Sequence, residues 1–120
     1  SQAEADRVYA AAPLANDLLA VLDNFERAIE AARQSGSEGI VTGLDMVHKQ
    51  LIDVMAKHGI EPIPALDHPF DPNIHEALMQ QPTADRPEGT VVAELTRGYR
   101  LHDRVLRPSR VAVSVKPAEE

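Results

Sequence analysis

Two stretches in the first half of the chain carry apolar residues at alternating steps of three and four, which is the spacing of one face of an α-helix. The first stretch predicts a helix with a single apolar stripe made of Leu14, Leu18, Val21, Leu22, Phe25, Ala28, Ile29 and Ala32. Pro13 precedes this stripe. It either opens the helix in its first turn or kinks a longer helix, because a prolyl residue lacks a backbone donor and crowds the preceding turn.

A short turn at residues 34–39 separates the first helix from a second one, because glycine and serine interrupt the periodicity there. Ser35 and Glu38 have the spacing of a capping box, which predicts the start of the second helix. Its apolar stripe consists of Ile40, Val41, Leu44, Val47, Leu51, Val54 and Met55. We expect Gly59 to end this helix in a left-handed conformation, and the prolines that follow prevent any continuation.

Beyond Gly59 the period of the pattern changes from helical spacing to two. Val111, Val113 and Val115 alternate with small or polar residues and predict a strand, in which Ser109 would be an ordinary polar position. Shorter strands are predicted at residues 91–95, 99–101 and 105–107. Residues 60–90 are rich in proline, so we expect mostly irregular backbone there, with a short helical turn around Asn73 to Met79.

These elements predict an α+β protein with two parts, a helical dimerisation region at residues 1–59 and a small, mostly antiparallel β-domain at residues 60–120. A helical hairpin alone has only half a core against which to bury its two stripes. Pairing with a second copy gives a dimeric four-helix bundle, which is the simplest way to cover both faces. The alternative is that the hairpin packs on its own C-terminal module.

The composition of the chain narrows the classes of function. Its 120 residues suit one domain or two small modules, and the absence of cysteine excludes a disulfide framework and favours a cytoplasmic location. A formal net charge of -7 argues against nucleic-acid binding, because phosphate recognition needs a positive field. No apolar run is long enough to span a bilayer, so we expect no membrane association.

A local cluster of positive charge stands out against this acidic background, because Asp103 is the one acidic residue among five arginines. The cluster consists of Arg97, Arg100, Arg104, Arg107 and Arg110. Such a patch either meets a carboxylate-rich surface of a protein partner or is a solvated strand face.

One group of residues suggests metal chemistry, because imidazoles and carboxylates lie close together at Asp67, His68, Asp71, His75 and Glu76. It would correspond to a small metal-dependent hydrolase centred on His68, Asp71 and His75. The alternative is that Asp71 and Asn73 satisfy turn backbone groups while His75 hydrogen-bonds within its module. Prolines separate the candidates in a loop, so we favour the second interpretation and expect no metal. The chain also lacks a nucleophile elbow, a phosphate-binding glycine loop and a paired cysteine motif. Together with the family resemblance described below, this leads us to expect no enzymatic activity and no cofactor.

Two runs in the second half of the chain resemble the signature of a known family. They are residues 98–115, which start Gly-Tyr-Arg-Leu and end Val-Ala-Val-Ser-Val, and residues 70–77, Phe-Asp-Pro-Asn-Ile-His-Glu-Ala. Residues 18–28 and the Gly43-Leu44 pair continue the match, which covers nearly the whole chain. On these motifs the chain resembles the GrpE family, whose members are nucleotide exchange factors for DnaK-type chaperones.

The resemblance implies a homodimer in which a long N-terminal helix, a helix bundle and a compact β-wing follow one another. Residues 1–32 would then be the last part of the long helix. The wing of one protomer would grip the ATPase domain of DnaK, open its nucleotide cleft and promote ADP release. The chief rival is a dimeric scaffold or adaptor whose β-module binds some other protein.

The resemblance also implies a set of contact positions in the β-wing, namely Phe70, Pro72, Leu95, Arg104 and Val113. Arg104 is the strongest candidate, because it belongs to a predicted hairpin and guanidinium groups make directional pairs with carboxylates. Phe70 and Val113 suit the core equally well, because an apolar residue in an alternating strand usually faces inward.

Three further positions in the bundle match positions with a role in the family. Arg27 and Glu30 match positions that approach the ATPase domain. Gly43 matches a glycine at which relatives require a small side chain, which implies that a neighbouring backbone comes close there. The predicted partner-binding set therefore spans both parts of the chain.

Overall fold

The computed structural model of the 120-residue chain describes residues 1–118. The chain divides into two compact units, a helical unit that comprises Ser1–Ile60 and a β-unit that contains the described residues from Glu61 onward.

Three helices make up most of the helical unit: α1 (Gln2–Val8), α2 (Ala12–Gln34) and α3 (Glu38–Lys57). Ser1 caps α1 with a capping box, in which its side chain accepts from the Glu4 backbone amide. Pro13 lies in the first turn of α2. It therefore opens this helix, as one of the two sequence-based alternatives predicted. None of the helices in residues 1–118 is long and apolar enough to cross a membrane.

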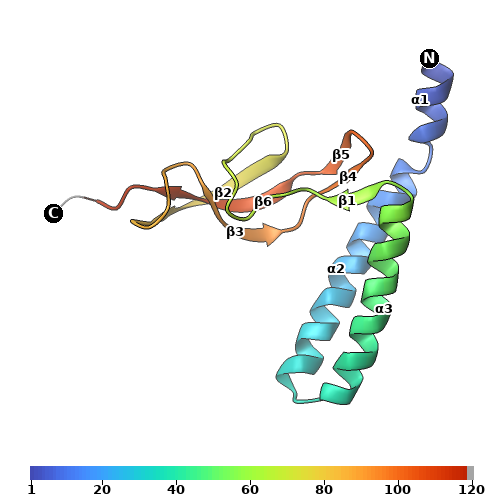
Figure 1. Ribbon diagram of the computed structural model, residues 1–120, viewed down its shortest axis with the longest axis horizontal. Helices are drawn as coiled ribbons and strands as arrows, with labels where there is room; N and C mark the ends of the chain where they lie inside the picture. Colours follow the sequence, from blue (N-terminus) through green and yellow to red (C-terminus); the bar gives the residue numbers. More distant parts are fainter. Residues whose placement is uncertain (119–120) are drawn as a thin grey trace. The chain divides into compact units, whose positions relative to one another are not determined.

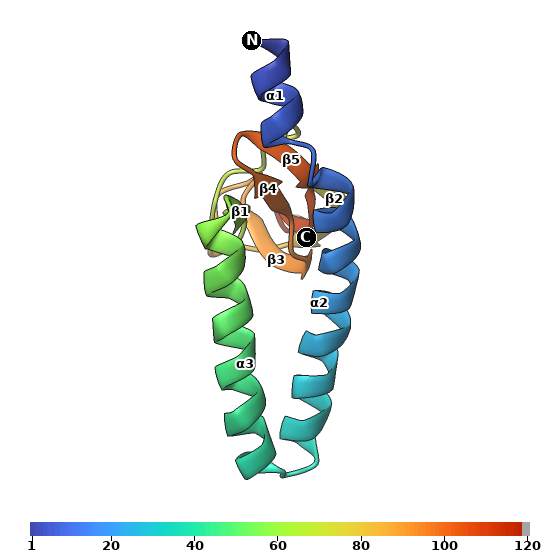
Figure 2. The ribbon, with the colours of Figure 1, turned by 90° about the vertical axis from the view of Figure 1, so that its right-hand side faces the viewer.

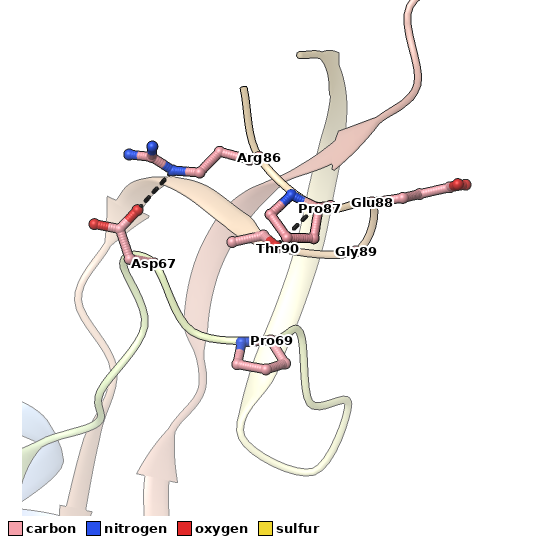
Figure 3. A pocket seen from close by; sticks show the side chains of 7 residues that line it. All are labelled: Asp67, Pro69, Arg86, Pro87, Glu88, Gly89 and Thr90. Carbon is pink, nitrogen blue, oxygen red and sulfur yellow. Dashed lines mark hydrogen bonds and ion pairs between the residues drawn. The ribbon is translucent and has the colours of Figure 1, made fainter. Parts of the chain in front are cut away.

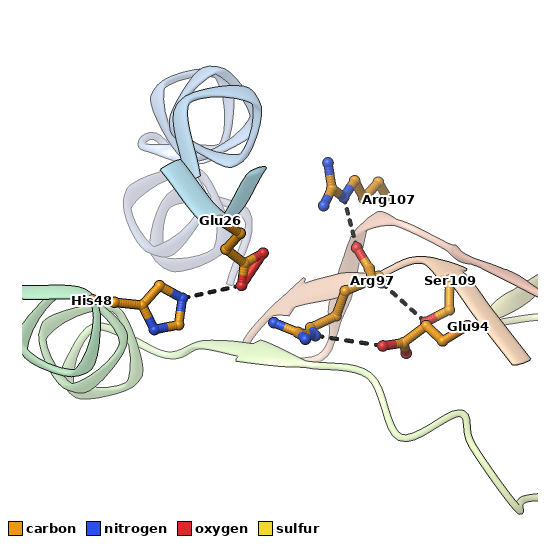
Figure 4. Close-up of polar contacts among 7 residues, drawn as sticks. Glu26, His48, Glu94, Arg97, Arg107 and Ser109 are labelled. Atoms are coloured by element: carbon orange, nitrogen blue, oxygen red, sulfur yellow. Dashed lines mark hydrogen bonds and ion pairs between the residues drawn. The ribbon is translucent and has the colours of Figure 1, made fainter. Parts of the chain in front are cut away.

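Helices α2 and α3 form the predicted hairpin and lie side by side (Figures 1 and 2). Their buried residues are Ala15, Leu19, Leu22 and Ile29 from α2 and Val41 and Met55 from α3. Glu26 and His48 join the two helices through a carboxylate–imidazole contact of 3.0 Å (Figure 4), and the ring of Phe25 stacks on His48. The hairpin thus has a narrow apolar seam with polar contacts at its edge.

The ends of α2 and α3 differ in detail from the prediction. The expected capping box of Ser35 and Glu38 is wrong, because Ser37 is the N-cap residue of α3 and makes no side-chain capping bond. Ser35 instead ends α2, where its hydroxyl donates to the carbonyl of Ala32. Gly59 has a φ of 83°, so the predicted left-handed residue after the second helix is confirmed.

The β-unit contains two three-stranded sheets (Figure 1). The first has the strand order β1 (Ile60–Pro62), β4 (Tyr99–Leu101) and β5 (Arg104–Arg107). The second has the order β2 (His75–Pro82), β6 (Ser109–Val115) and β3 (Val91–Thr96). β3 and β5 each pair antiparallel with a neighbour, whereas β2 pairs with β6 in parallel.

The helical turn predicted around Asn73 to Met79 is wrong from His75 onward, because β2 occupies these residues. Alanine, leucine, methionine and glutamine favour helices in isolation. Pairing with β6 overrides that preference, because a long-range ladder satisfies the backbone groups of a segment that is too short to form a stable helix alone.

The core of the second sheet consists of Ala65, Val91 and Val111, and Phe70 and Val113 pack against it. Ser114 is fully buried in β6 and supports the loop before β3. Its hydroxyl accepts from the Thr90 amide and donates to the carbonyl of Pro87. The buried hydroxyl of Ser114 therefore gives these two backbone groups of the loop a hydrogen-bond partner.

The two sheets meet at Gly98 and Ser109, a contact that we name the Gly98–Ser109 junction. The Gly98 amide donates to the Ser109 hydroxyl over 3.0 Å. The Gly98 carbonyl accepts from the Ile63 amide, and the Ser109 amide donates to the carbonyl of Ile74. Ser109 is fully buried, so the expectation that it is an ordinary polar strand residue is wrong.

Replacing Gly98 by alanine should destabilise the β-unit, because a Cβ there would overlap the backbone nitrogen and the hydroxyl of Ser109. We expect Gly98→Ala to lower the free energy of unfolding by about 3 kcal/mol, measured by denaturant unfolding followed by circular dichroism. Gly39→Ala is the matched control. Because nothing lies within 4 Å of a Cβ at Gly39, it should raise stability by roughly 0.5 to 1 kcal/mol. Equal stability of the two variants would contradict the role of the junction.

Candidate partner-binding surfaces

On the helical unit, two of the predicted contact residues share one exposed face of α2. Arg27 and Glu30 are three residues apart and therefore lie on neighbouring positions of the helix surface. Arg27 donates to the side chain of Asn24, while Glu30 lies 3.6 Å from the guanidinium of Arg33. These contacts are local and exposed, so a partner could replace them at little cost in free energy.

Gly43 lies on the exposed surface of α3. Apart from its chain neighbours and the backbone of its own helix, no described atom lies within 4 Å of a Cβ placed at this position. Nothing in the described chain therefore requires a glycine here. A requirement for a small side chain at Gly43 would have to come from another molecule.

On the β-unit, the five predicted contact residues fall into two groups. Phe70 and Val113 are partly buried and pack against the core of the second sheet. Pro72, Leu95 and Arg104 are exposed, and the side chain of Leu95 is 46% accessible. Phe70 and Val113 thus contribute to packing and are only partly accessible, whereas the other three side chains are exposed.

His75 holds the loop that carries Phe70 and Pro72. Its ring is buried, and its Nδ1 accepts from the Asp71 amide over 3.0 Å. The proton therefore resides on Nε2, which donates to the carbonyl of Pro64 over 2.8 Å. The Phe70 ring lies 5.9 Å from the imidazole. The imidazole of His75 thus links the start of this loop, at Pro64, to its middle, at Asp71.

The same loop borders a hollow of about 630 Å³, which we name the proline hollow. Its lining residues are Pro64, His68, Pro69, Phe70, Asp71, Pro72, Ile74, His75 and Arg100. Arg100 comes from β4 and was not among the contact residues expected from the sequence. The arginine cluster between positions 97 and 110 was the signal that could have drawn attention to it.

A second hollow of about 500 Å³ lies beside the loop between β2 and β3 (Figure 3). An ion pair between Arg86 Nε and the carboxylate of Asp67, 2.9 Å apart, borders it. Asp67 has a φ of 66°, which is an unusual conformation for a residue other than glycine. This ion pair connects two loops that are 19 residues apart in the sequence.

The predicted arginine patch is partly neutralised within the β-unit. Arg97 pairs with Glu94 at 3.4 Å and Arg110 with Glu76 at 3.5 Å. Arg107 donates to the carbonyl of Arg97 (Figure 4) and lies over the ring of Tyr99, 5.6 Å from its centre. Several of these guanidinium groups therefore stabilise the β-unit itself, and the patch is not one continuous positive surface.

Asp71 and His75, two residues of the candidate metal cluster, make hydrogen bonds within the β-unit. Within residues 1–118 no three histidine or carboxylate side chains converge so that they could hold a metal ion. Both ring nitrogens of His75 are engaged in hydrogen bonds to the backbone, so its lone pair is not available as a ligand. The Asp71 carboxylate accepts from the Asn73 amide, as expected for a turn-forming residue.

Comparison with known proteins places both units in one family. Residues 1–115 match the family model described as GrpE. A protein named "Protein GrpE" from Rhodopirellula baltica is 49% identical over 115 residues, which cover 92% of this chain and 58% of that protein.

Two further relatives with the same name give a similar result. The protein from Geobacillus thermodenitrificans is 46% identical over 92% of this chain and 51% of its own length. The protein from Aquifex aeolicus is 42% identical over 98% of this chain and 65% of its own length. The chain therefore spans between about half and two thirds of the curated relatives that it matches.

Removing the imidazole of His75 should destabilise the β-unit, because it leaves the carbonyl of Pro64 and the amide of Asp71 without their partner. We expect His75→Ala to lower the free energy of unfolding by about 2 to 4 kcal/mol in denaturant unfolding. His68→Ala, at an exposed position of the same loop, should change it by no more than about 0.5 kcal/mol. A metal site would give a different result. A chelator would then destabilise the wild type, and neither His75→Ala nor His68→Ala would be further destabilised by the chelator.

Proposed function

The chain belongs to the GrpE family, and on this premise we propose that it is a co-chaperone and an adenine-nucleotide exchange factor for a DnaK-type chaperone. The observation that carries the proposal is the family match over residues 1–115, which spans the helical unit and nearly all of the described β-unit. In this proposal the protein acts in the cytoplasm in protein folding and the stress response. It works by binding the ATPase domain and needs neither a cofactor nor catalytic residues.

Linkage accounts for the proposed exchange activity. A protein that binds the open form of a nucleotide cleft more tightly than the closed form shifts the population toward the open form. By reciprocity it weakens nucleotide binding by the same factor, and ADP weakens its own binding to the chaperone. Equal affinity for both forms would have no effect on ADP release, so the contact surface must distinguish them.

Such a mechanism requires a contact surface that does not deform when it holds the cleft open. In the β-unit, His75 fastens the loop that carries Phe70 and Pro72. The Gly98–Ser109 junction connects the sheet that carries Leu95 and Val113 to the sheet that carries Arg104. These buried hydrogen bonds connect the parts of the β-unit that carry Phe70, Pro72, Leu95, Arg104 and Val113. They support the proposal that these five residues form one surface that binds the chaperone.

We further propose that the protein is a homodimer held by its helical unit. Several large apolar side chains of α2 and α3 are at least 49% exposed, namely Leu14, Val21, Ile40, Met46, Val47 and Val54. A hairpin of two helices has no further layer against which to bury these side chains. A second copy would cover them in a four-helix bundle.

Replacing Arg104 should impair nucleotide exchange, because its exposed guanidinium can pair with a carboxylate of the chaperone. The measurement is stopped-flow release of a fluorescent ADP analogue from the nucleotide-binding domain of a DnaK-type chaperone. We expect the wild type to accelerate release, and Arg104→Ala to lose about tenfold or more of that acceleration at a subsaturating concentration.

Lys49→Ala is the matched control for Arg104→Ala, because it also removes one exposed positive charge and leaves the carboxylate of Asp53 without its ion pair. Sedimentation velocity would show that both variants keep the oligomeric state of the wild type. A folded wild-type protein that leaves ADP release unchanged would contradict the exchange-factor proposal and favour a dimeric adaptor. Equal activity of all three proteins would exclude a role for Arg104.

A large side chain at Gly43 should leave the free protein folded but weaken its binding, if a partner's backbone approaches α3 there. In the described chain, a Cβ at Gly43 has no neighbour within 4 Å, and leucine has a higher helix propensity than glycine. We expect Gly43→Leu to melt at or above the temperature of the wild type and to bind the nucleotide-free chaperone domain at least tenfold more weakly. Gly39→Leu, one turn earlier and equally unhindered, should bind like the wild type. The assignment of Gly43 is wrong if both variants bind equally.

A further inference from the structure

The proline hollow is a preformed site. Three of its lining residues are prolines at positions 64, 69 and 72, whose rings restrict the backbone before any partner arrives. His75 fastens the loop through the Pro64 carbonyl and the Asp71 amide, and the Phe70 amide donates to the carbonyl of Gly89. Binding in such a hollow requires little further ordering, which favours affinity.

The lining of the hollow is apolar where it is formed by the loop. The rings of Pro64, Pro69, Phe70 and Pro72 and the side chain of Ile74 surround it. Pro64, Pro69 and Pro72 are exposed, whereas Phe70 and Ile74 are half-buried. This arrangement offers an apolar side chain of a partner a surface from which water is readily displaced.

Arg100 gives the hollow a positive charge on the side formed by β4. Its side chain is 48% exposed, and its Nη2 lies 3.7 Å from the carboxylate of Glu61. A charge-assisted hydrogen bond is roughly 2.7 to 2.9 Å long, so this ion pair leaves the guanidinium able to bind a closer acceptor. By comparison, Arg86 Nε lies 2.9 Å from the Asp67 carboxylate, which is the distance of a close ion pair.

Arg100 is the one arginine or lysine among the lining residues of the hollow. Asp71 is the one carboxylate among the lining residues, and it accepts from the Asn73 amide. The arginine fork offers two parallel donors, which fit the two oxygens of a carboxylate.

We propose that the proline hollow receives an apolar side chain from the nucleotide-binding domain of a DnaK-type chaperone, and that Arg100 pairs with a carboxylate beside that side chain. The inference rests on the proposed function and adds Arg100 as a specificity-determining residue. Phe70 and Pro72 belong both to the proposed contact surface and to the lining of the hollow, so Arg100 extends that surface onto β4.

The test measures how tightly the nucleotide-free nucleotide-binding domain of a DnaK-type chaperone binds wild type, Arg100→Ala, Arg100→Glu and Arg86→Ala, by biolayer interferometry at two salt concentrations. Arg86→Ala is the matched control. It removes one positive charge from a similarly exposed side chain of the same unit and leaves the carboxylate of Asp67 without its ion pair, but lies outside the hollow. Thermal melting establishes that all four proteins are folded.

We expect the dissociation constant to rise about tenfold in Arg100→Ala and further in Arg100→Glu, where a like charge faces the carboxylate. Arg86→Ala should stay within about twofold of the wild type. The difference between wild type and Arg100→Ala should narrow at high salt, because ions screen an exposed pair.

Two results would overturn the inference about Arg100. Wild-type affinity in Arg100→Ala would show that no carboxylate pairs there, and an equal loss in Arg86→Ala would show that only the overall charge matters. Failure of the proposed function would look different, because the wild type itself would then neither bind the domain nor accelerate ADP release. That outcome would overturn both proposals, and the wild-type measurements alone reveal it.

Discussion

The hydrogen bond between the Gly98 amide and the Ser109 hydroxyl is the contact on which the β-unit depends. Gly98 precedes β4, Ser109 begins β6, and their backbone groups also bind Ile63 and Ile74. One buried hydroxyl thereby joins the two three-stranded sheets. Only a residue without a Cβ allows the two backbones to approach so closely.

Structural and binding roles overlap in the loop between β1 and β2. Phe70 packs against the core of the second sheet and also lines the proline hollow. A substitution of Phe70 would therefore affect both the core and the hollow. His75 illustrates how a polar residue supports such a loop. Its neutral imidazole supplies one donor and one acceptor, and each meets a buried or turn-forming backbone group. Asp71 and His75, two of the residues that suggested a metal site, therefore make hydrogen bonds that hold this loop.

The helical unit relies on a different principle. Its hairpin buries few side chains in the seam between α2 and α3 and exposes several large apolar ones. The cross-helix contact of Glu26 with His48 aligns the two helices but adds no apolar burial. A nucleotide exchange factor acts by binding its partner and catalyses no reaction itself. In the proposal, each of the two units presents a surface for such binding. The apolar helix faces suit a second copy, whereas the loop and hairpin residues of the β-unit suit the chaperone.

The sequence by itself determined the two long helices, the turn between them, Gly59 as the residue that follows the second helix, and the last strand, in which valines alternate with small or polar residues. These features depend on local periodicity and on backbone preferences that act over a few residues. Tertiary structure decided that residues 75–82 form a strand, because pairing with β6 outweighs helix propensity. It also decided the burial of Ser109 and the proximity of Arg100 to Phe70, since both result from contacts between residues far apart in the chain, and no local pattern encodes which distant backbone will lie beside a given side chain.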